Sequence, residues 1–263
     1  MKFSAGIVQF DVRTGELELN MEHAFEGLCR LGEQGAGLAV LPEMWSCGFD
    51  NKNLKVHATK TDAVLKKIAE TALKYNMIIA GSMPEIFEGN IYNTLYVVNT
   101  DGTLSGSYRK VHLFSLTNEP KYFSRGTKGV VCETSIGRVG LMTCYDLRFP
   151  ELCRSLALQD ANIIIISAQW PSARIGHWNA LIKARAIENQ IFIVAANRCG
   201  KDKYIKFGGC SQIVSPVGNI TVISKDKQCI LKEEIDFREI TEFRNAIPCL
   251  RERVPEAYVI KKS

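Results

Sequence analysis

The sequence lacks any apolar run long enough to cross a membrane. Its longest largely apolar run, residues 161–168, is eight residues long, whereas a membrane-spanning helix needs about 20. Residues 1–10 lack the apolar stretch and cleavage site of a secretory signal peptide, and they have the composition of a β-strand instead. We therefore expect a cytoplasmic protein that is not inserted into a membrane.

The sequence also lacks a strong charge of either sign and any cluster of metal-ligating side chains. It has 33 lysines and arginines against 28 aspartates and glutamates, and the basic residues are scattered. We therefore expect neither nucleic acid nor an anionic membrane as a partner. None of the nine cysteines forms a C-x-x-C pair, and there are four histidines. Since zinc sites need such ligands at short spacing, we expect no metal, and we expect free thiols.

Segments with strand and helix patterns alternate along the 263 residues, which predicts one α/β domain with helices covering the strands. Residues 163–168 are nearly all apolar, as expected for a strand covered on both faces. Residues 61–75 have apolar side chains at the i, i+3 and i+4 spacing of an amphipathic helix. Other strands are expected at 3–10, 38–41, 77–81, 90–98, 106–110, 137–144 and 192–196, with two or three more up to 235, and other helices at 16–34, 150–159 and 178–190.

After Asp236 the pattern thins into a charged segment, residues 236–263. We interpret this segment as a C-terminal tail that either packs on a partner subunit or frays, as chain ends commonly do.

Cys144 stands where a strand pattern gives way to a helix pattern. The apolar residues 139–143 lead directly into it, and Phe149, Pro150 and Glu151 open the next helix, with proline at a first helical position. A nucleophile at such a turn is exposed at the strand's end, beside backbone N–H groups that can bind an oxyanion. A buried structural cysteine would fit the same pattern.

Two charged residues follow strand patterns elsewhere in the chain. Glu43 comes just after the apolar residues 38–41, at the rim where open α/β sheets place their sites. Lys110 ends the strand pattern of residues 106–110. Each of these residues, considered alone, is also consistent with an ordinary charge in solvent.

Together the three segments resemble, in order and spacing, the Glu-Lys-Cys triad of the nitrilase superfamily of carbon–nitrogen hydrolases. The resemblance covers essentially the whole chain up to about Asp236, including the opening strand with Gln9. It implies a four-layer α-β-β-α sandwich formed by one domain, residues 1–263, and dimers that join these sandwiches through helices into a longer stack. It also implies that no cofactor is used. The motifs that carry it are LPE at 41–43, RKVHL at 109–113, CYDLRFPE at 144–151, NTLYV at 93–97 and ARAIENQ at 184–190.

The resemblance also implies roles for individual residues. Cys144 would attack an amide carbon to give a thioester, with Glu43 as the acid–base group that moves the protons. Lys110 and the backbone N–H of Tyr145 would stabilise the oxyanion. A second carboxylate is expected between the lysine and cysteine motifs, and Glu119 is the candidate by position, orienting Lys110 or the substrate. Glu133, in a strand-like segment, is the less favoured choice.

Within the superfamily, residues 44–49 (MWSCGF) and 168–174 (AQWPSAR) are most similar to the bacterial omega-amidases. Such enzymes hydrolyse the terminal amide of short dicarboxylate half-amides such as 2-oxoglutaramate. The substrate's second anionic end would require a cation, and Arg148 and Arg174 are the candidates. Arg148 could instead pair with Asp146 or Glu151. The expected walls of the pocket are aromatic: Phe114, Tyr145 and Trp170.

Several alternatives stay open at this point. N-carbamoyl amino acids, deaminated glutathione and nitriles are substrates of other branches that use the same triad. A catalytically silent binding or scaffold protein could share the fold. A Cys–His dyad is the weaker alternative, because none of the four histidines stands in a matching motif, and its plausible members are His112 and His177. The expected assembly is a homodimer or a higher even oligomer that binds a small-molecule amide.

Overall fold

The computed structural model describes residues 1–258 and contains two six-stranded sheets that lie face to face. The first sheet has the strand order β12-β1-β2-β3-β4-β5. Its central strands, β1 to β3, are parallel, and its outer pairs are antiparallel. Its strands are β1 (Lys2–Gln9), β2 (Leu38–Val40), β3 (Ile78–Phe87), β4 (Asn90–Val98), β5 (Leu104–Arg109) and β12 (Cys229–Asp236).

The second sheet has the order β11-β10-β9-β8-β7-β6 and the same plan, with parallel strands β7 to β9 at its centre and antiparallel pairs at its edges. Its strands are β6 (Val131–Thr134), β7 (Gly137–Thr143), β8 (Ile163–Ala168), β9 (Phe192–Asn197), β10 (Gln212–Val214) and β11 (Ile220–Ile223).

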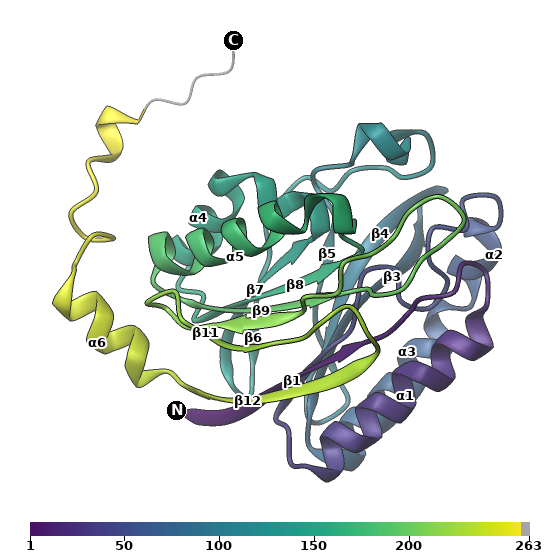
Figure 1. Ribbon diagram of the computed structural model, residues 1–263, viewed down its shortest axis with the longest axis horizontal. Helices are drawn as coiled ribbons and strands as arrows, with labels where there is room; N and C mark the ends of the chain where they lie inside the picture. Colours follow the sequence, from purple (N-terminus) through teal and green to yellow (C-terminus); the bar gives the residue numbers. More distant parts are fainter. Residues whose placement is uncertain (259–263) are drawn as a thin grey trace.

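Helices cover the outer face of each sheet, so the molecule has four layers in the order α-β-β-α (Figure 1). Helices α1 (Leu17–Glu33) and α3 (Thr61–Tyr75) cover the first sheet, and α4 (Pro150–Leu158) and α5 (Ile175–Asn189) cover the second. None of the helices within residues 1–258 is long and apolar enough to span a membrane. The remaining elements are α2 (Leu54–Thr59), α6 (Arg238–Ala246) and the short 3₁₀ turns η1 (Ser115–Thr117), η2 (Glu119–Lys121), η3 (Cys144–Arg148), η4 (Ser172–Arg174) and η5 (Pro255–Ala257).

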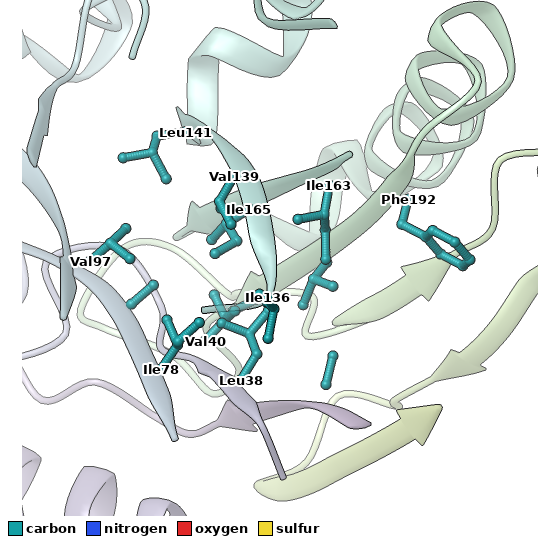
Figure 2. Close-up of a cluster of buried hydrophobic side chains, with 14 of the residues drawn as sticks. Leu38, Val40, Ile78, Val97, Ile136, Val139, Leu141, Ile163, Ile165 and Phe192 are labelled. Atoms are coloured by element: carbon teal, nitrogen blue, oxygen red, sulfur yellow. The ribbon is translucent and has the colours of Figure 1, made fainter. Parts of the chain in front are cut away.

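The largest apolar core lies between the two sheets. Leu38, Val40 and Ile78 reach into it from the first sheet and meet Val139 and Ile165 of the second (Figure 2). All five side chains are fully buried, and burying an aliphatic side chain of this size contributes about 1.5–3 kcal/mol. This shared core fixes the distance between the sheets, and therefore between residues at the ends of their strands.

The fold predicted from the sequence is confirmed, with differences at several boundaries. The hairpin of β4 and β5 is present, and so are three strands after β9. Strand β3 runs to Phe87 instead of ending at Gly81, because it forms a second hairpin with β4 around Glu88 and Gly89, both at positive φ. Gly81 and Pro84 resemble strand breakers in the sequence, but long-range pairing overrides this local preference. The short helix α2 was not predicted.

The C-terminal segment contains more regular structure than a charged tail suggests. It includes helix α6, and Gln190 at the end of α5 donates a hydrogen bond from Nε2 to the Ile247 carbonyl oxygen at 2.8 Å. Helix α6 lies beside the sandwich (Figure 1), where Ile240 belongs to the core between the sheets, and Arg244 and Pro248 line one hollow together with Leu158 of α4. The assignment of residues 236–263 as a tail on a partner subunit stays a prediction, and residues 259–263 of that tail lie outside the described part of the chain.

Candidate active site

The three predicted residues meet at the seam between the two sheets. Glu43 follows β2 and Lys110 follows β5, both in the first sheet, whereas Cys144 follows β7 in the second. Hydrogen bonds join the sheets here: for example, Ser167 Oγ donates to the Leu41 carbonyl at 2.8 Å, and the Glu43 N–H donates to the Ala168 carbonyl at 3.3 Å. The strand ends therefore bring residues about a hundred positions apart into one site.

Lys110 lies between two carboxylates. Its Nζ is 2.8 Å from Glu43 Oε1 and 2.9 Å from Glu119 Oε2. All three side chains are buried, with exposed fractions of 1%, 0% and 6% for Lys110, Glu43 and Glu119. Taking charges out of water is costly unless they are paired and hydrogen-bonded. The ion pairs offset this cost, and the structure thus brings Glu119 to the lysine that it was predicted to support.

Further hydrogen bonds hold each carboxylate in place. Glu43 Oε1 accepts a bond from Asn93 Nδ2 at 2.8 Å, and Glu43 Oε2 accepts one from the Gln169 backbone N–H at 3.1 Å. Glu119 Oε2 accepts one from the Phe114 N–H at 3.1 Å. With the lysine, these donors fix the orientation of both carboxylates at the base of the site.

Cys144 is the first residue of η3 and directly follows β7, in a strained turn. Its φ is 45°, in the left-handed region that a non-glycine residue rarely adopts. Such a conformation costs on the order of 1–3 kcal/mol and persists only where the surroundings enforce it. The side chain is therefore presented at the end of the strand, as expected for a nucleophile on a strand-to-helix turn. The N–H of Tyr145 belongs to the first turn of η3, where backbone donors have no acceptor inside the helix.

Asp146 holds this turn against the segment that carries Lys110. Its carboxylate is fully buried and accepts four hydrogen bonds. These come from the Thr143 N–H at 2.9 Å, Tyr108 Oη at 2.8 Å, and the backbone N–H and Nδ1 of His112 at 3.0 and 2.8 Å. The His112 ring also stacks on Phe149. His112 is thus a structural partner of Asp146, and within residues 1–258 no hydrogen bond joins it or His177 to Cys144.

The site's charges set the protonation states of its members. Burial raises the pKa of the Cys144 thiol well above its usual value, and the negative charge of Glu43 adds to this while Lys110 opposes it. Burial alone would lower the pKa of Lys110, but Glu43, Glu119 and Cys144 together raise it well above normal. At neutral pH the site therefore holds a neutral thiol and an ammonium group. Such a thiol needs a proton acceptor before it can act as a nucleophile.

Cys144 opens onto a cavity of about 460 Å³. Arg148 lies over the ring of Trp170, with 4.7 Å from Cζ to the ring centroid, and Arg174 lies over Phe114 at 5.8 Å. All predicted substrate-binding residues line this cavity: Phe114, Tyr145, Arg148, Trp170 and Arg174.

Neither arginine has an acidic partner in residues 1–258 within ion-pair distance. The alternative pairing of Arg148 with Asp146 or Glu151 is not formed, since Asp146 is occupied by other donors and Arg148 Nη1 lies 3.3 Å from His177 Nδ1. Glu133, the less favoured candidate for the second carboxylate, lies on β6 and pairs with Arg138 instead of Lys110. Both pocket arginines are therefore available to an anionic ligand.

Two residues of the site were not predicted from the sequence. Asn93 and Gln169 stand inside segments that carry the family resemblance, but nothing assigned them a role. Each is a polar residue within or directly after a buried strand, β4 and β8. That position was the available signal, because buried polar side chains are nearly always hydrogen-bonded. The loop that supplies Asp202, Tyr204, Ile205 and Phe207 to the cavity was also not foreseen.

No group of three potential metal ligands occurs within residues 1–258.

Comparison with known proteins agrees with this geometry. Residues 4–245 match the carbon–nitrogen hydrolase family. The chain is 36% identical to a 2-oxoglutaramate amidase of Bacillus subtilis, covering 94% of this chain and 96% of that one, and 35% identical to a 2-oxoglutaramate amidase of Paenarthrobacter nicotinovorans, covering 86% and 81%. The crystal structure of a carbon–nitrogen hydrolase from Helicobacter pylori superimposes with a TM-score of 0.92 at 27% identity, over 98% and 97% of the two chains. The chain therefore belongs to the carbon–nitrogen hydrolase family.

Proposed function

We propose that this enzyme hydrolyses the terminal amide of a small substrate that also carries a carboxylate, and that it releases ammonia. The observation that supports this most directly is one cavity lined by Cys144 and Glu43 together with Arg148 and Arg174, two arginines without an acidic partner among residues 1–258. The first pair supplies amide chemistry, and the second pair supplies recognition of an anion. Relatives named 2-oxoglutaramate amidase are consistent with such a substrate.

In the acylation step, Cys144 Sγ attacks the amide carbon while Glu43 accepts the thiol proton. Coupling attack to proton transfer is needed because the thiol is neutral at neutral pH. Glu43 then delivers the proton to the nitrogen of the collapsing intermediate, so that ammonia leaves and a thioester remains on Cys144. A positioned acid–base group contributes typically about 10²–10⁴-fold to the rate.

The oxyanion that forms during attack needs fixed donors. Lys110, held protonated by its two carboxylates, and the backbone N–H of Tyr145 in the first turn of η3 are assigned to this role. Removing one such donor typically costs about 2.7–4 kcal/mol of transition-state stabilisation. Glu119 keeps Lys110 in position through its 2.9 Å contact. In the deacylation step, Glu43 activates a water molecule that hydrolyses the thioester.

The substrate's carboxylate is assigned to Arg148 or Arg174. Each guanidinium is held over an aromatic ring, which limits its motion and leaves its N–H edge available. A guanidinium can bind a carboxylate through two parallel hydrogen bonds. Phe114, Tyr145 and Trp170 then exclude water from the chain of carbon atoms between the two ends of the substrate.

A substrate panel assayed by ammonia release tests the proposal. We expect 2-oxoglutaramate and succinamate to be hydrolysed, and Cys144→Ala to be inactive while keeping its circular dichroism spectrum. A thioester trapped on Cys144 and identified by mass spectrometry would support the mechanism. Hydrolysis of N-carbamoyl amino acids, deaminated glutathione or nitriles in place of the half-amides would overturn the substrate assignment. Activity in Cys144→Ala would overturn the mechanism.

We further propose a cytoplasmic homodimer. All nine cysteines are free thiols, which is consistent with a reducing compartment. Leu158 of α4 and Ile187 of α5 are exposed apolar residues on the outer helical layer, where a second subunit would pack. Ile247 and Val254 of the C-terminal tail are also exposed. Light scattering on the full chain should give twice the 29.4 kDa chain mass, and a monomer would contradict this assignment.

A further inference from the structure

Arg198, immediately after β9, is a fully buried arginine that faces the back of the active site. Its exposed fraction is 1%. Its Nη1 donates a hydrogen bond to Gln169 Oε1 at 2.9 Å, and its Nη2 donates one to Asp11 Oδ1 at 3.2 Å. We propose that Arg198 is a positioning residue for amide hydrolysis, acting on Glu43 through Gln169. This inference rests on the proposed role of Glu43 as the acid–base group.

The contacts form an unbroken chain from Arg198 to the carboxylate. Gln169 Nε2 donates to the backbone carbonyl of Glu43 at 2.7 Å, and the Gln169 backbone N–H donates to Glu43 Oε2 at 3.1 Å. Gln169 therefore contacts Glu43 at both its main chain and its side chain. Arg198 is the donor at Gln169 Oε1, so it fixes which way the amide of Gln169 points. A rotated amide would place an oxygen against the Glu43 carbonyl, which has no hydrogen to donate.

A role in stability alone explains these contacts poorly. Burying a guanidinium is costly, and an apolar side chain of similar size often stabilises a protein equally well at such a position. Asp11 is the one acidic residue within ion-pair distance of Arg198 in the described chain, and Arg198 Nε has no acceptor there. The buried charge of Arg198 is thus only partly compensated by Asp11. Its other side-chain hydrogen bond goes to Gln169, a residue of the active site.

The residues around Arg198 hold its guanidinium group in one position. Gly200 adopts a φ of +81°, and a Cβ at this position would lie 2.1 Å from Cγ of Asp11. The glycine therefore allows the carboxylate to approach Arg198. On its other side the guanidinium lies 4.0 Å from the ring centroid of Phe207, which lines the catalytic cavity. Arg198 consequently links the cavity wall to the support of Glu43.

The central experiment compares Arg198→Met with a matched control, Arg154→Met. Arg154 is a half-buried arginine on α4 that donates to the Glu188 carbonyl at 2.6 Å and does not line the cavity. Displacing a catalytic group by about 1 Å costs on the order of 10²-fold in rate. We expect kcat of Arg198→Met to fall about 10–100-fold with KM changed less than about threefold, and Arg154→Met to keep its kcat.

Alkylation of Cys144 by iodoacetamide provides a readout that lost stability would not change. The rate at Cys144 depends on Glu43 as proton acceptor, whereas Cys249 is exposed and serves as an internal reference measured in the same digest. We expect Arg198→Met, assayed below its unfolding temperature, to slow alkylation of Cys144 relative to Cys249 and to alter its pH profile. An unchanged ratio and profile in a folded variant with unchanged kcat would overturn the inference.

Two further variants keep the inference testable if Arg198→Met fails to fold. Arg198→Lys retains the charge but cannot bridge Gln169 and Asp11 together, so it should recover part of the lost kcat. Gln169→Leu removes the link while leaving the Arg198–Asp11 pair intact, and should lower kcat to a similar extent as loss of Arg198. Full kcat in Gln169→Leu would refute the inference. Activity in Cys144→Ala would refute the proposed function instead, so the two failures are distinguishable.

Discussion

Replacing Lys110 by methionine tests the charge arrangement of the site most directly. The substitution keeps the length of the side chain but removes its charge, leaving Glu43 and Glu119 buried without the cation that lies 2.8 and 2.9 Å from them. Removing one partner of a buried ion pair costs about 3–5 kcal/mol. We therefore expect the free energy of unfolding to fall by that amount near pH 8. Loss of an oxyanion donor should also lower kcat by two to three orders of magnitude.

The destabilisation should depend on pH in a defined direction. The pKa of Glu119 is already raised by burial and by Glu43, and Lys110 opposes this rise. Without the lysine the pKa of Glu119 rises further above its unfolded value. The folded state then binds the proton more tightly than the unfolded state does, so stability is highest at acidic pH and is lost as pH increases through the folded pKa.

Urea unfolding of Lys110→Met at pH 5 and pH 8, compared with Lys66→Met on the exposed face of α3, measures this effect. The variant should be more stable at pH 5 than at pH 8, relative to the unmodified protein. A second substitution, Glu119→Gln, should restore part of the stability at pH 8. Equal stability of Lys110→Met and the unmodified protein at pH 8 would show that the three charges do not compensate one another.

Four other substitutions probe separate parts of the site. Glu43→Gln keeps the size of the side chain but removes the proton acceptor, and should lower kcat by about 10²–10⁴-fold in ammonia-release assays. Asp146→Asn replaces an acceptor of four hydrogen bonds, and should lower the unfolding free energy by about 1–3 kcal/mol in urea titrations. Arg148→Leu and Arg174→Leu, assayed separately, should identify the carboxylate-binding residue by a raised KM for succinamate but not for a neutral amide. An unchanged kcat in Glu43→Gln, or an unchanged unfolding free energy in Asp146→Asn, would contradict the role of that residue. An unchanged KM for succinamate in both arginine variants would contradict the assignment of the carboxylate-binding residue.

The sequence predicts most of the fold from local patterns. A strand pattern ends at or just before Glu43, Lys110 and Cys144, which made each a candidate, but their roles were assigned only from the resemblance of the three motifs together to one family. The partners of these residues could not be found in this way. Gln169 contacts Glu43 across 126 positions of the chain, and no spacing rule connects them.

The partners of the pocket arginines could likewise not be predicted from the sequence. The motif around Arg148 left three partners open: Asp146, Glu151 and a substrate. Only the structure shows that Asp146 is occupied by Tyr108, Thr143 and His112, which leaves Arg148 facing the cavity. Helix α6 was missed for another reason: its sequence is strongly polar and Ile240 is its single buried residue, so the segment resembles a charged chain end.

The seam between the sheets links catalysis to the course of folding. Leu41 and Ser167 come from different sheets and are separated by 126 positions, so the bond between them forms only when both sheets are complete and packed together. Contacts of such long sequence separation form slowly, because a long loop must close first. During refolding from urea, helix and strand signals should therefore recover before any amidase activity does. Turnover is thus a stricter criterion of the native state of this chain than its content of secondary structure.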